Sequence, residues 1–320
     1  MPSLNETMDL YRRILLIRMC EEKIREVYPG DEIKSPVHLS IGQEAIPVGV
    51  CHCMPRGTRY FGTYRNHALY LNLTNDVEGF FCELYGKASG AGRGKAGSMH
   101  LMAPEVGLMA TSAVVGTTLP VAVGAALACQ YQGGDGWTVV FFGDGAMEEG
   151  VFGESMNFAC LRGLRILFVC EDNGLAIHAP AKDRRGYRSV MDLTQAFDCY
   201  AASAEGQDVF KVIEKTRKIM EGMEQAPKPG FLHFTYHRFL EHVGVNEDYQ
   251  HGYRKRPSDQ ELRQLDPAQV LSGQMARLGG VEADLEKMRN ELKERIEKSV
   301  AQARAAPFPE PGELCTEVVL

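Results

Sequence analysis

The sequence predicts an α/β protein: a parallel sheet with helices on both faces, and helical segments at the N- and C-terminal ends. Two short apolar runs, residues 137–142 and 165–170, have the composition of strands that are buried on both faces of a parallel sheet. A helical stretch over residues 148–161 separates them. Strand, helix and strand at this spacing form a βαβ unit, in which both strands belong to one parallel sheet.

The N-terminal part of the chain is predicted to be helical. Apolar residues between Leu10 and Ile24 recur at helical spacing, and the turn-forming PGDE after Tyr28 ends this helix. Residues 35–56 are predicted to hold a loop and then a helix from Gln43.

The glycine-rich, basic segment GKASGAGRGKAGS, residues 86–98, is predicted to be a loop. Its composition fits both an anion-binding cradle and a flexible connector. Lys95 in this loop is either a solvated charge or a contact to a ligand or partner.

Residues 106–134 carry no charge, a length sufficient to span a membrane. The stretch is rich in Gly, Ala, Ser and Thr, so its hydrophobicity is weak, and a helix buried on all sides is the preferred interpretation. Within it, LPVAVGAALACQY is expected to be a small-residue helix packed against the sheet.

A later strand is predicted at residues 231–236 and an amphipathic helix near the C-terminus. One face of that helix carries an apolar stripe: Val281, Leu285, Met288, Leu292, Ile296 and Val300. The chain is interpreted as one domain, residues 1–320, with a helical arm over about 1–34 and a helical tail over about 256–320.

Composition excludes several classes of partner. The net charge of −7 comes from dispersed acids, and no basic stripe suggests nucleic-acid binding. The N-terminus lacks the apolar core of a secretory signal, and nine cysteines in mostly apolar surroundings fit reduced thiols, so a cytoplasmic protein without a membrane segment is expected. Cys51-His52-Cys53 resembles half of a zinc site, but no second Cys/His pair stands at the required spacing.

Two polar residues follow the first two predicted strands. Asp144 ends one strand within GDG, and Asn173 follows the next, so adjacent parallel strands would bring both side chains to one edge of the sheet. Their oxygens are the hard ligands that Mg²⁺ takes alongside phosphates. Gly143 and Gly145 allow close approach of a diphosphate, and a helix opening at Gly145-Ala146 would favour an anion. GDG alone is also an ordinary turn.

The order GDG, helix, strand, Asn resembles the thiamin diphosphate motif of thiamin-dependent enzymes. The wider context is similar to the alpha subunit of the decarboxylating component of 2-oxoacid dehydrogenases, of the pyruvate, branched-chain and acetoin types. Four more stretches agree in order: HLSIGQEA from residue 38, YRNH from 64, GRGKAGSMH from 92 and VVGTTLPVAVGAALA from 114. The resemblance covers residues 10–270 and implies a thiamin diphosphate-binding fold.

The resemblance implies a role for each matching residue. Asp144 and Asn173 are expected to ligate Mg²⁺ with the backbone carbonyl of Leu175. The remaining cofactor contacts that it implies are Tyr64, Arg65, Gly143, Gly145 and Ala146 at the diphosphate, and the backbone around Ala113 and Val115 at the aminopyrimidine. His67 and His242 are expected to line the active-site entrance as catalytic residues, whereas His38, His100, His233 and His237 are expected to be structural or at the rim.

The resemblance also implies cofactors and partners. Thiamin diphosphate and Mg²⁺ would serve decarboxylation of a 2-oxo acid, or cleavage of acetoin, with transfer of the acyl unit to a lipoyl-bearing acyltransferase. A separate beta subunit would supply the activating glutamate, within a heterotetramer of alpha and beta chains.

One loop departs from the family pattern. In residues 235–249, Glu241 replaces the glycine before the histidine and Val243 stands where a serine often occurs, while Asp172 replaces a frequent Asn and Ala113 a glycine. Glu241 is either a buried charge partner or a solvated loop carboxylate. Two other functions therefore stay open: a carboligase or transketolase-like subunit acting on a ketose, and a non-catalytic cofactor-binding paralogue.

Overall fold

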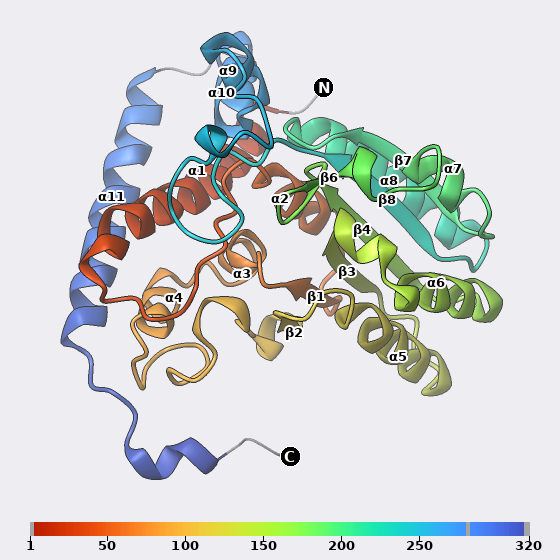
Figure 1. Cartoon of the computed structure of the whole chain (residues 1–320), viewed down its shortest axis with the longest axis horizontal. Helices are drawn as coiled ribbons and strands as arrows, with labels where there is room; N and C mark the ends of the chain where they lie inside the picture. The colour runs from red at the N-terminus through yellow and green to blue at the C-terminus, as the bar shows by residue number, and fades with distance from the viewer. Residues whose placement is uncertain (1–2, 280–281, 317–320) are drawn as a thin grey trace.

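A six-stranded parallel sheet forms the centre of the computed structural model, which describes residues 3–279 and 282–316 (Figure 1). The strands are ordered β2-β1-β3-β4-β8-β7. Their bounds are Arg59–Thr63 (β1), Leu108–Ser112 (β2), Thr138–Gly143 (β3), Ile166–Asp172 (β4), Tyr200–Glu205 (β7) and Gly230–Thr235 (β8). A short antiparallel hairpin, β5 (Leu175–Ala176) with β6 (Ala179–Pro180), follows β4. The predicted α/β fold with a parallel sheet is confirmed.

Helices precede, connect and follow the strands. Their bounds are Leu4–Val27 (α1), Ala45–Cys53 (α2), His67–Thr74 (α3), Val77–Leu84 (α4), Thr118–Tyr131 (α5), Gly150–Arg162 (α6), Val190–Thr194 (α7), Val209–Gln225 (α8), Asp259–Leu265 (α9), Pro267–Arg277 (α10) and Glu282–Ala305 (α11). The helices expected near both ends of the chain are thus present as α1 and as α9 to α11. The assignment of the whole chain to one domain stays a prediction.

The sheet is covered on both faces, as predicted. Successive residues of β3 alternate between two cores: Val140 and Phe142 face α5 and α6, whereas Val139 and Phe141 face the core to which α1, α2 and α8 contribute. All residues of β4 are buried, which explains why its sequence is a continuous apolar run up to Cys170.

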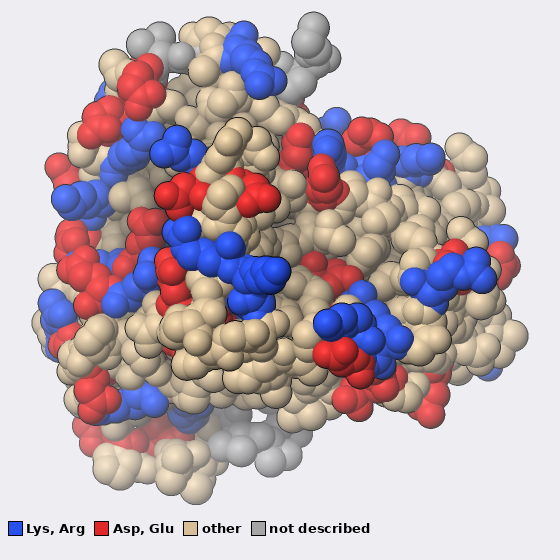
Figure 2. Space-filling model, turned by 45° about the horizontal axis from the view of Figure 1, so that its top comes forward, with Lys and Arg blue, Asp and Glu red and all other residues tan. Residues whose placement is uncertain are grey.

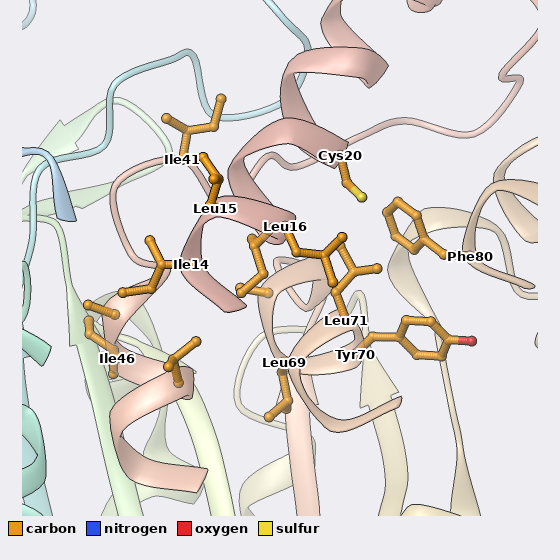
Figure 3. Close-up of a cluster of buried hydrophobic side chains, with 14 of the residues drawn as sticks. Ile14, Leu15, Leu16, Cys20, Ile41, Ile46, Leu69, Tyr70, Leu71 and Phe80 are labelled. Atoms are coloured by element: carbon orange, nitrogen blue, oxygen red, sulfur yellow. The ribbon is translucent and has the colours of Figure 1, made fainter. Parts of the chain in front are cut away.

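The N-terminal helix α1 belongs to the larger core. In Figure 3, three side chains of α1 lie beside other helices: Ile14 beside Ile46 of α2, Leu16 beside Leu71 of α3 and Cys20 beside Phe80 of α4, and all of these are buried. Near the other end of the chain, α11 packs against α1 and α4. Its predicted stripe is buried at Leu285, Met288, Leu292, Ile296 and Val300, and Val281 lies outside the described residues.

The interpretation of residues 106–134 as a helix buried on all sides is wrong. This stretch contains β2 and the helix α5, joined by a short connection. The helix α5 packs on β1 and β3 with one face, while Val121 and Tyr131 are 53% and 74% exposed. Within the described residues, none of the helices is both long and apolar enough to cross a membrane.

Acidic and basic side chains are mixed on the face of the molecule shown in Figure 2, without a continuous basic stripe. In the structure, the Cys51-His52-Cys53 segment does not form part of a zinc site within the described residues. His52 contacts Glu6 and the Cys53 thiol donates to backbone carbonyls, and the described chain contains no group of three or more His, Cys, Asp or Glu side chains arranged around a metal position.

Candidate cofactor site

A cavity opens where the carboxyl ends of the parallel strands meet. It encloses about 980 Å³ of space, part of it open to solvent. Its lining comes from segments that follow β1, β2, β3, β4 and β8. The strand order reverses between β1 and β3, and this switch point is where open α/β sheets bind ligands.

The GDG segment forms the turn at the end of β3. Asp144 is 1% exposed, and Gly143, Gly145 and Ala146 line the cavity with it. A Cβ atom at Gly145 would lie 3.1 Å from the Cβ of Ala176, so a larger side chain would press on the hairpin. A 3-10 helix, Asp144–Glu148, comes before α6, so the regular helix begins five residues later than Gly145.

Asn173 lies on the same cavity as Asp144. The register pairs Gly143 with Glu171, so both polar residues extend just beyond neighbouring strand ends. The Asn173 amide Nδ2 donates to the hydroxyl of Tyr236 at 2.9 Å, and its Oδ1 accepts from the Leu175 N–H at 3.0 Å. The two residues that the sequence analysis placed together are therefore brought together, and Leu175 joins them in the lining.

Two arginines that the sequence analysis missed contact this acidic site. Arg184 forms ion pairs with Asp144 and Glu148. The Arg185 Nη2 lies 2.6 Å from Oδ2 of Asp144 and 3.0 Å from Oδ2 of Asp172. The only sequence signal was the basic run KDRRGYR, and such runs in loops are more often solvated.

The two aspartates have different protonation equilibria. Burial and the nearby charge of Asp172 raise the pKa of Asp144 to about 6, against the opposing effect of Arg184 and Arg185. Burial also acts on Asp172, but His233 at 2.9 Å and Arg185 outweigh it and lower its pKa to about 2. Asp172 is thus the firmly ionised member of the pair.

Tyr64 and Arg65 reach the cavity from the end of β1, as the resemblance implied. The Arg65 guanidinium is buried, and it donates to the backbone carbonyls of Leu39 at 2.7 Å and His242 at 2.9 Å. These bonds hold a fixed positive charge at the cavity wall.

His242 lines the cavity, and His38 packs beside it. The ring centroid of His38 lies 4.4 Å from that of Tyr64 and 5.1 Å from that of His242. Burial and the charge of Arg65 lower the pKa of both histidines to about 3, so both imidazoles are neutral at physiological pH. His38, expected only to be structural or at the rim, forms a cluster with two predicted site residues.

His67 does not lie at the entrance, and its predicted position there is wrong. Its side chain is fully buried at the start of α3, away from the cavity lining. Nδ1 lies 3.1 Å from Oε1 of Glu21, and Nε2 lies 2.7 Å from Oγ of Ser98. The edge contact of its ring with Phe80 fixes it in the core.

The segment after β2 forms another wall of the cavity. Ser112, Val114, Val115 and Gly116 line it, with Val114 63% and Val115 43% exposed. Ala113 lies between lining residues but is not itself in the lining. This wall is therefore apolar and accessible from outside.

The glycine-rich loop is an anion cradle, and the anion belongs to the chain itself. The buried carboxylate of Glu83 accepts from the N–H groups of Gly92, Gly94, Ala96 and Gly97 at 2.7–2.9 Å. The Lys95 ammonium donates to the carbonyls of Glu313 and Thr316 near the C-terminus. The loop thus has a structural anion, and Lys95 a partner within the chain.

Glu241 is bound within its own loop. Its Oε1 accepts from the Asn246 N–H at 2.8 Å, and the side chain is absent from the cavity lining. The departure from the family loop is therefore accommodated locally, and the interpretation of Glu241 as a buried charge partner is not supported.

The residues present fit a magnesium diphosphate group. Asp144 and Asn173 offer hard oxygens, Arg65 offers a positive charge, and the GDG turn leaves room for close approach. Two buried oxygens in the lining, Oε1 of Gln43 and Oε1 of Glu171, have no hydrogen-bond partner among the residues that the structure describes, as expected where a ligand is to be bound.

Comparison with known proteins identifies the family. Residues 11–312 match the family described as the dehydrogenase E1 component, so the chain belongs to that family. It is 29% identical to the alpha subunit of acetoin:2,6-dichlorophenolindophenol oxidoreductase from Bacillus subtilis, over 97% of this chain and 92% of that protein. It is 31% identical to the same subunit from Cupriavidus necator, over 97% of this chain and 93% of that protein. It is also 29% identical to the pyruvate dehydrogenase E1 component subunit alpha of Zymomonas mobilis, over 98% of this chain and 89% of that protein.

Proposed function

We propose that this chain is the alpha subunit of a thiamin diphosphate- and Mg²⁺-dependent enzyme that decarboxylates a 2-oxo acid or cleaves acetoin. The observation that carries the proposal is the shared cavity of Asp144 and Asn173 at the ends of adjacent parallel strands. The names of the relatives, which are alpha subunits of acetoin and pyruvate enzymes, support the same reaction class.

Several residues at the cavity have a role in this proposal. Asp144, Asn173 and the Leu175 carbonyl would hold Mg²⁺, while Arg65 would balance the negative charge of the diphosphate. When bound, thiamin diphosphate supplies a carbon nucleophile that also stores the electrons of the broken C–C bond. The neutral imidazole of His242, with His38 packed beside it, can orient a reacting group in the cavity by accepting or donating a hydrogen bond.

The proposal requires a beta subunit. The cavity wall formed by Val114 and Val115 is apolar and exposed, and the outer face of α5 exposes Val121. Exposed apolar patches of this kind mark interfaces with other proteins. A beta chain covering this wall would exclude water and supply the activating glutamate, and a lipoyl-bearing acyltransferase would take the acyl unit.

The carboligase alternative depended on the unusual loop around Glu241, and Glu241 is bonded within that loop away from the cavity. The non-catalytic alternative would be expected to lose site residues, yet Arg65, Asp144 and Asn173 are all in place. Neither alternative has a specific observation in its favour.

The test is Asp144→Asn, with Asp183→Asn as the matched control in a nearby exposed loop. We expect the D144N affinity for thiamin diphosphate in the presence of Mg²⁺, measured by calorimetry together with a beta-type subunit, to fall about 100-fold, since a charged metal ligand is lost. D183N should bind like the parent chain. Wild-type affinity in folded D144N, checked by circular dichroism, would remove this site from the proposal.

A further inference from the structure

Arg184 and Arg185 both form ion pairs with Asp144, the carboxylate that lines the cofactor cavity. Arg185 bridges Asp144 and Asp172, and Arg184 bridges Asp144 and Glu148. Both guanidinium groups contact the same oxygen of Asp144, Oδ2. Their side chains are only 12% and 15% exposed, so these ion pairs are shielded from solvent and weakly screened by salt.

The two arginines are attached to the segment that carries the second proposed metal ligand. The Ala181 N–H donates to the Gly174 carbonyl at 2.9 Å, and the Arg185 N–H donates to the Ala181 carbonyl at 2.9 Å. The Arg184 Nε donates to the Ala179 carbonyl in β6 at 3.2 Å. Movement of the arginines is therefore coupled to the hairpin that follows Asn173.

A divalent cation and these guanidinium groups compete for one carboxylate. Mg²⁺ bound to Asp144 would lie within a few ångströms of two fixed positive charges, and repulsion between like charges is strong at that distance in a buried site. Without a cation, the arginines balance the charges of Asp144, Asp172 and Glu148, which would otherwise repel one another.

We propose that Arg184 and Arg185 are built-in counterions of the cation site, which hold Asp144 in the metal-free chain and must leave it before the metal binds. The inference rests on the proposed function, because it takes Asp144 as the metal ligand. These arginines reduce the apparent affinity for divalent cations to the intrinsic affinity multiplied by the fraction of molecules in which Asp144 is free of them. They thereby couple metal loading to release of residues 177–188.

The first experiment measures binding of Mn²⁺ alone by electron paramagnetic resonance in the full chain. The Arg184→Gln/Arg185→Gln variant should bind Mn²⁺ at least tenfold more tightly than the parent chain. The matched control is Lys182→Gln/Arg188→Gln, which removes two exposed charges from the same loop, and its affinity should change less than twofold. Equal affinities in the two double variants, or weaker binding by the arginine variant, would overturn the inference.

A second measurement needs no substitution at the arginines. In the parent chain, Mn²⁺ with inorganic pyrophosphate should increase the rate of trypsin cleavage after Arg184 and Arg185 severalfold relative to cleavage after the exposed Arg188. An unchanged ratio would show that the arginines stay on Asp144, against the inference.

Asp144→Asn separates this inference from the proposed function. If D144N loses Mn²⁺ binding while the arginine variant binds like the parent chain, only the inference fails. If D144N binds Mn²⁺ as the parent chain does, the metal lies elsewhere and the proposed site fails together with the inference.

Discussion

At the scale of single residues, charge and burial at the cavity wall determine which groups are available for chemistry. Arg65 is fixed by two backbone carbonyls, and burial together with its charge keeps the imidazoles of His38 and His242 neutral. A neutral imidazole can both accept and donate a hydrogen bond, whereas an imidazolium can only donate. The buried arginine therefore has two effects: it helps to keep the two histidines neutral, and it offers a positive charge to an anionic ligand.

The depressed pKa of His38 predicts a loss of stability in acid. Its pKa of about 3 in the folded chain lies below the ordinary value near 6.5, so protons bind preferentially to the unfolded chain. The stabilisation is complete above pH 6.5 and is lost progressively as the pH falls toward 3. At pH 5 this amounts to up to about 2 kcal/mol for His38.

His38→Phe should therefore reduce the stability difference between pH 7 and pH 5, measured as the free energy of unfolding in urea. His251→Gln, at an exposed position, is the control and should leave that difference as it is in the parent chain. If H38F and H251Q show the same pH dependence, His38 is not responsible for the acid sensitivity.

At the scale of elements, the glycine-rich loop shows why composition left two interpretations open. Gly92, Gly94 and Gly97 present N–H groups as an anion site would, but the carboxylate they bind comes from α4. A sequence pattern reveals a cradle for an anion without revealing whether the anion is a ligand or a side chain of the same fold.

Glu83→Gln should destabilise this loop. The carboxylate accepts four N–H bonds through two oxygens, and an amide group would place its own donors against two of them, at a cost of about 3 kcal/mol. We expect faster hydrogen exchange at Gly92 to Gly97 and a lower urea midpoint. Glu78→Gln, exposed on the same helix, is the control, and equal exchange rates in both variants would argue against the cradle.

Physical patterns in the sequence predicted some elements and not others. The continuous apolar runs of β3 and β4 were recognisable because both faces of these strands are buried, and their order placed Asp144 beside Asn173. The strands β1, β2 and β7 were missed, since these are short segments with intermediate or mixed burial. Tyr64 and Arg65 were therefore assigned only through family resemblance.

Tertiary contacts determine the positions of the residues that sequence patterns misplaced or missed. His67 is adjacent to site residues in sequence, yet the start of α3 turns its ring toward Glu21 and the core. Arg184 and Arg185 lie in a loop of ordinary basic composition, and only folding of the β5–β6 hairpin brings them to Asp144. For the arginines the basic run is only a weak local signal, and for the position of His67 the sequence offers none.

At the scale of the whole molecule, the cavity and the first residues of α5 lie at the same end of the sheet. The helix α5 follows directly on the wall formed by Val114 and Val115, and its packed face covers β1 and β3 (Figure 1). Val121 on its outer face is an apolar residue that this chain does not bury. An interface that continues from the cavity wall onto α5 would bury both.

Val121→Lys should therefore weaken association with a beta-type subunit while the chain stays folded. A lysine in an apolar contact must lose its hydration without an opposite charge, and we expect the dissociation constant, measured by analytical ultracentrifugation, to rise about 100-fold. The control is Leu314→Lys, which places the same charge at an exposed apolar position in the segment Pro311–Cys315, and Figure 1 shows the chain before the end marked C well apart from α5. If association is unchanged in both V121K and L314K, the beta-type subunit does not bind at α5. A different contact would then have to cover the cavity wall formed by Val114 and Val115.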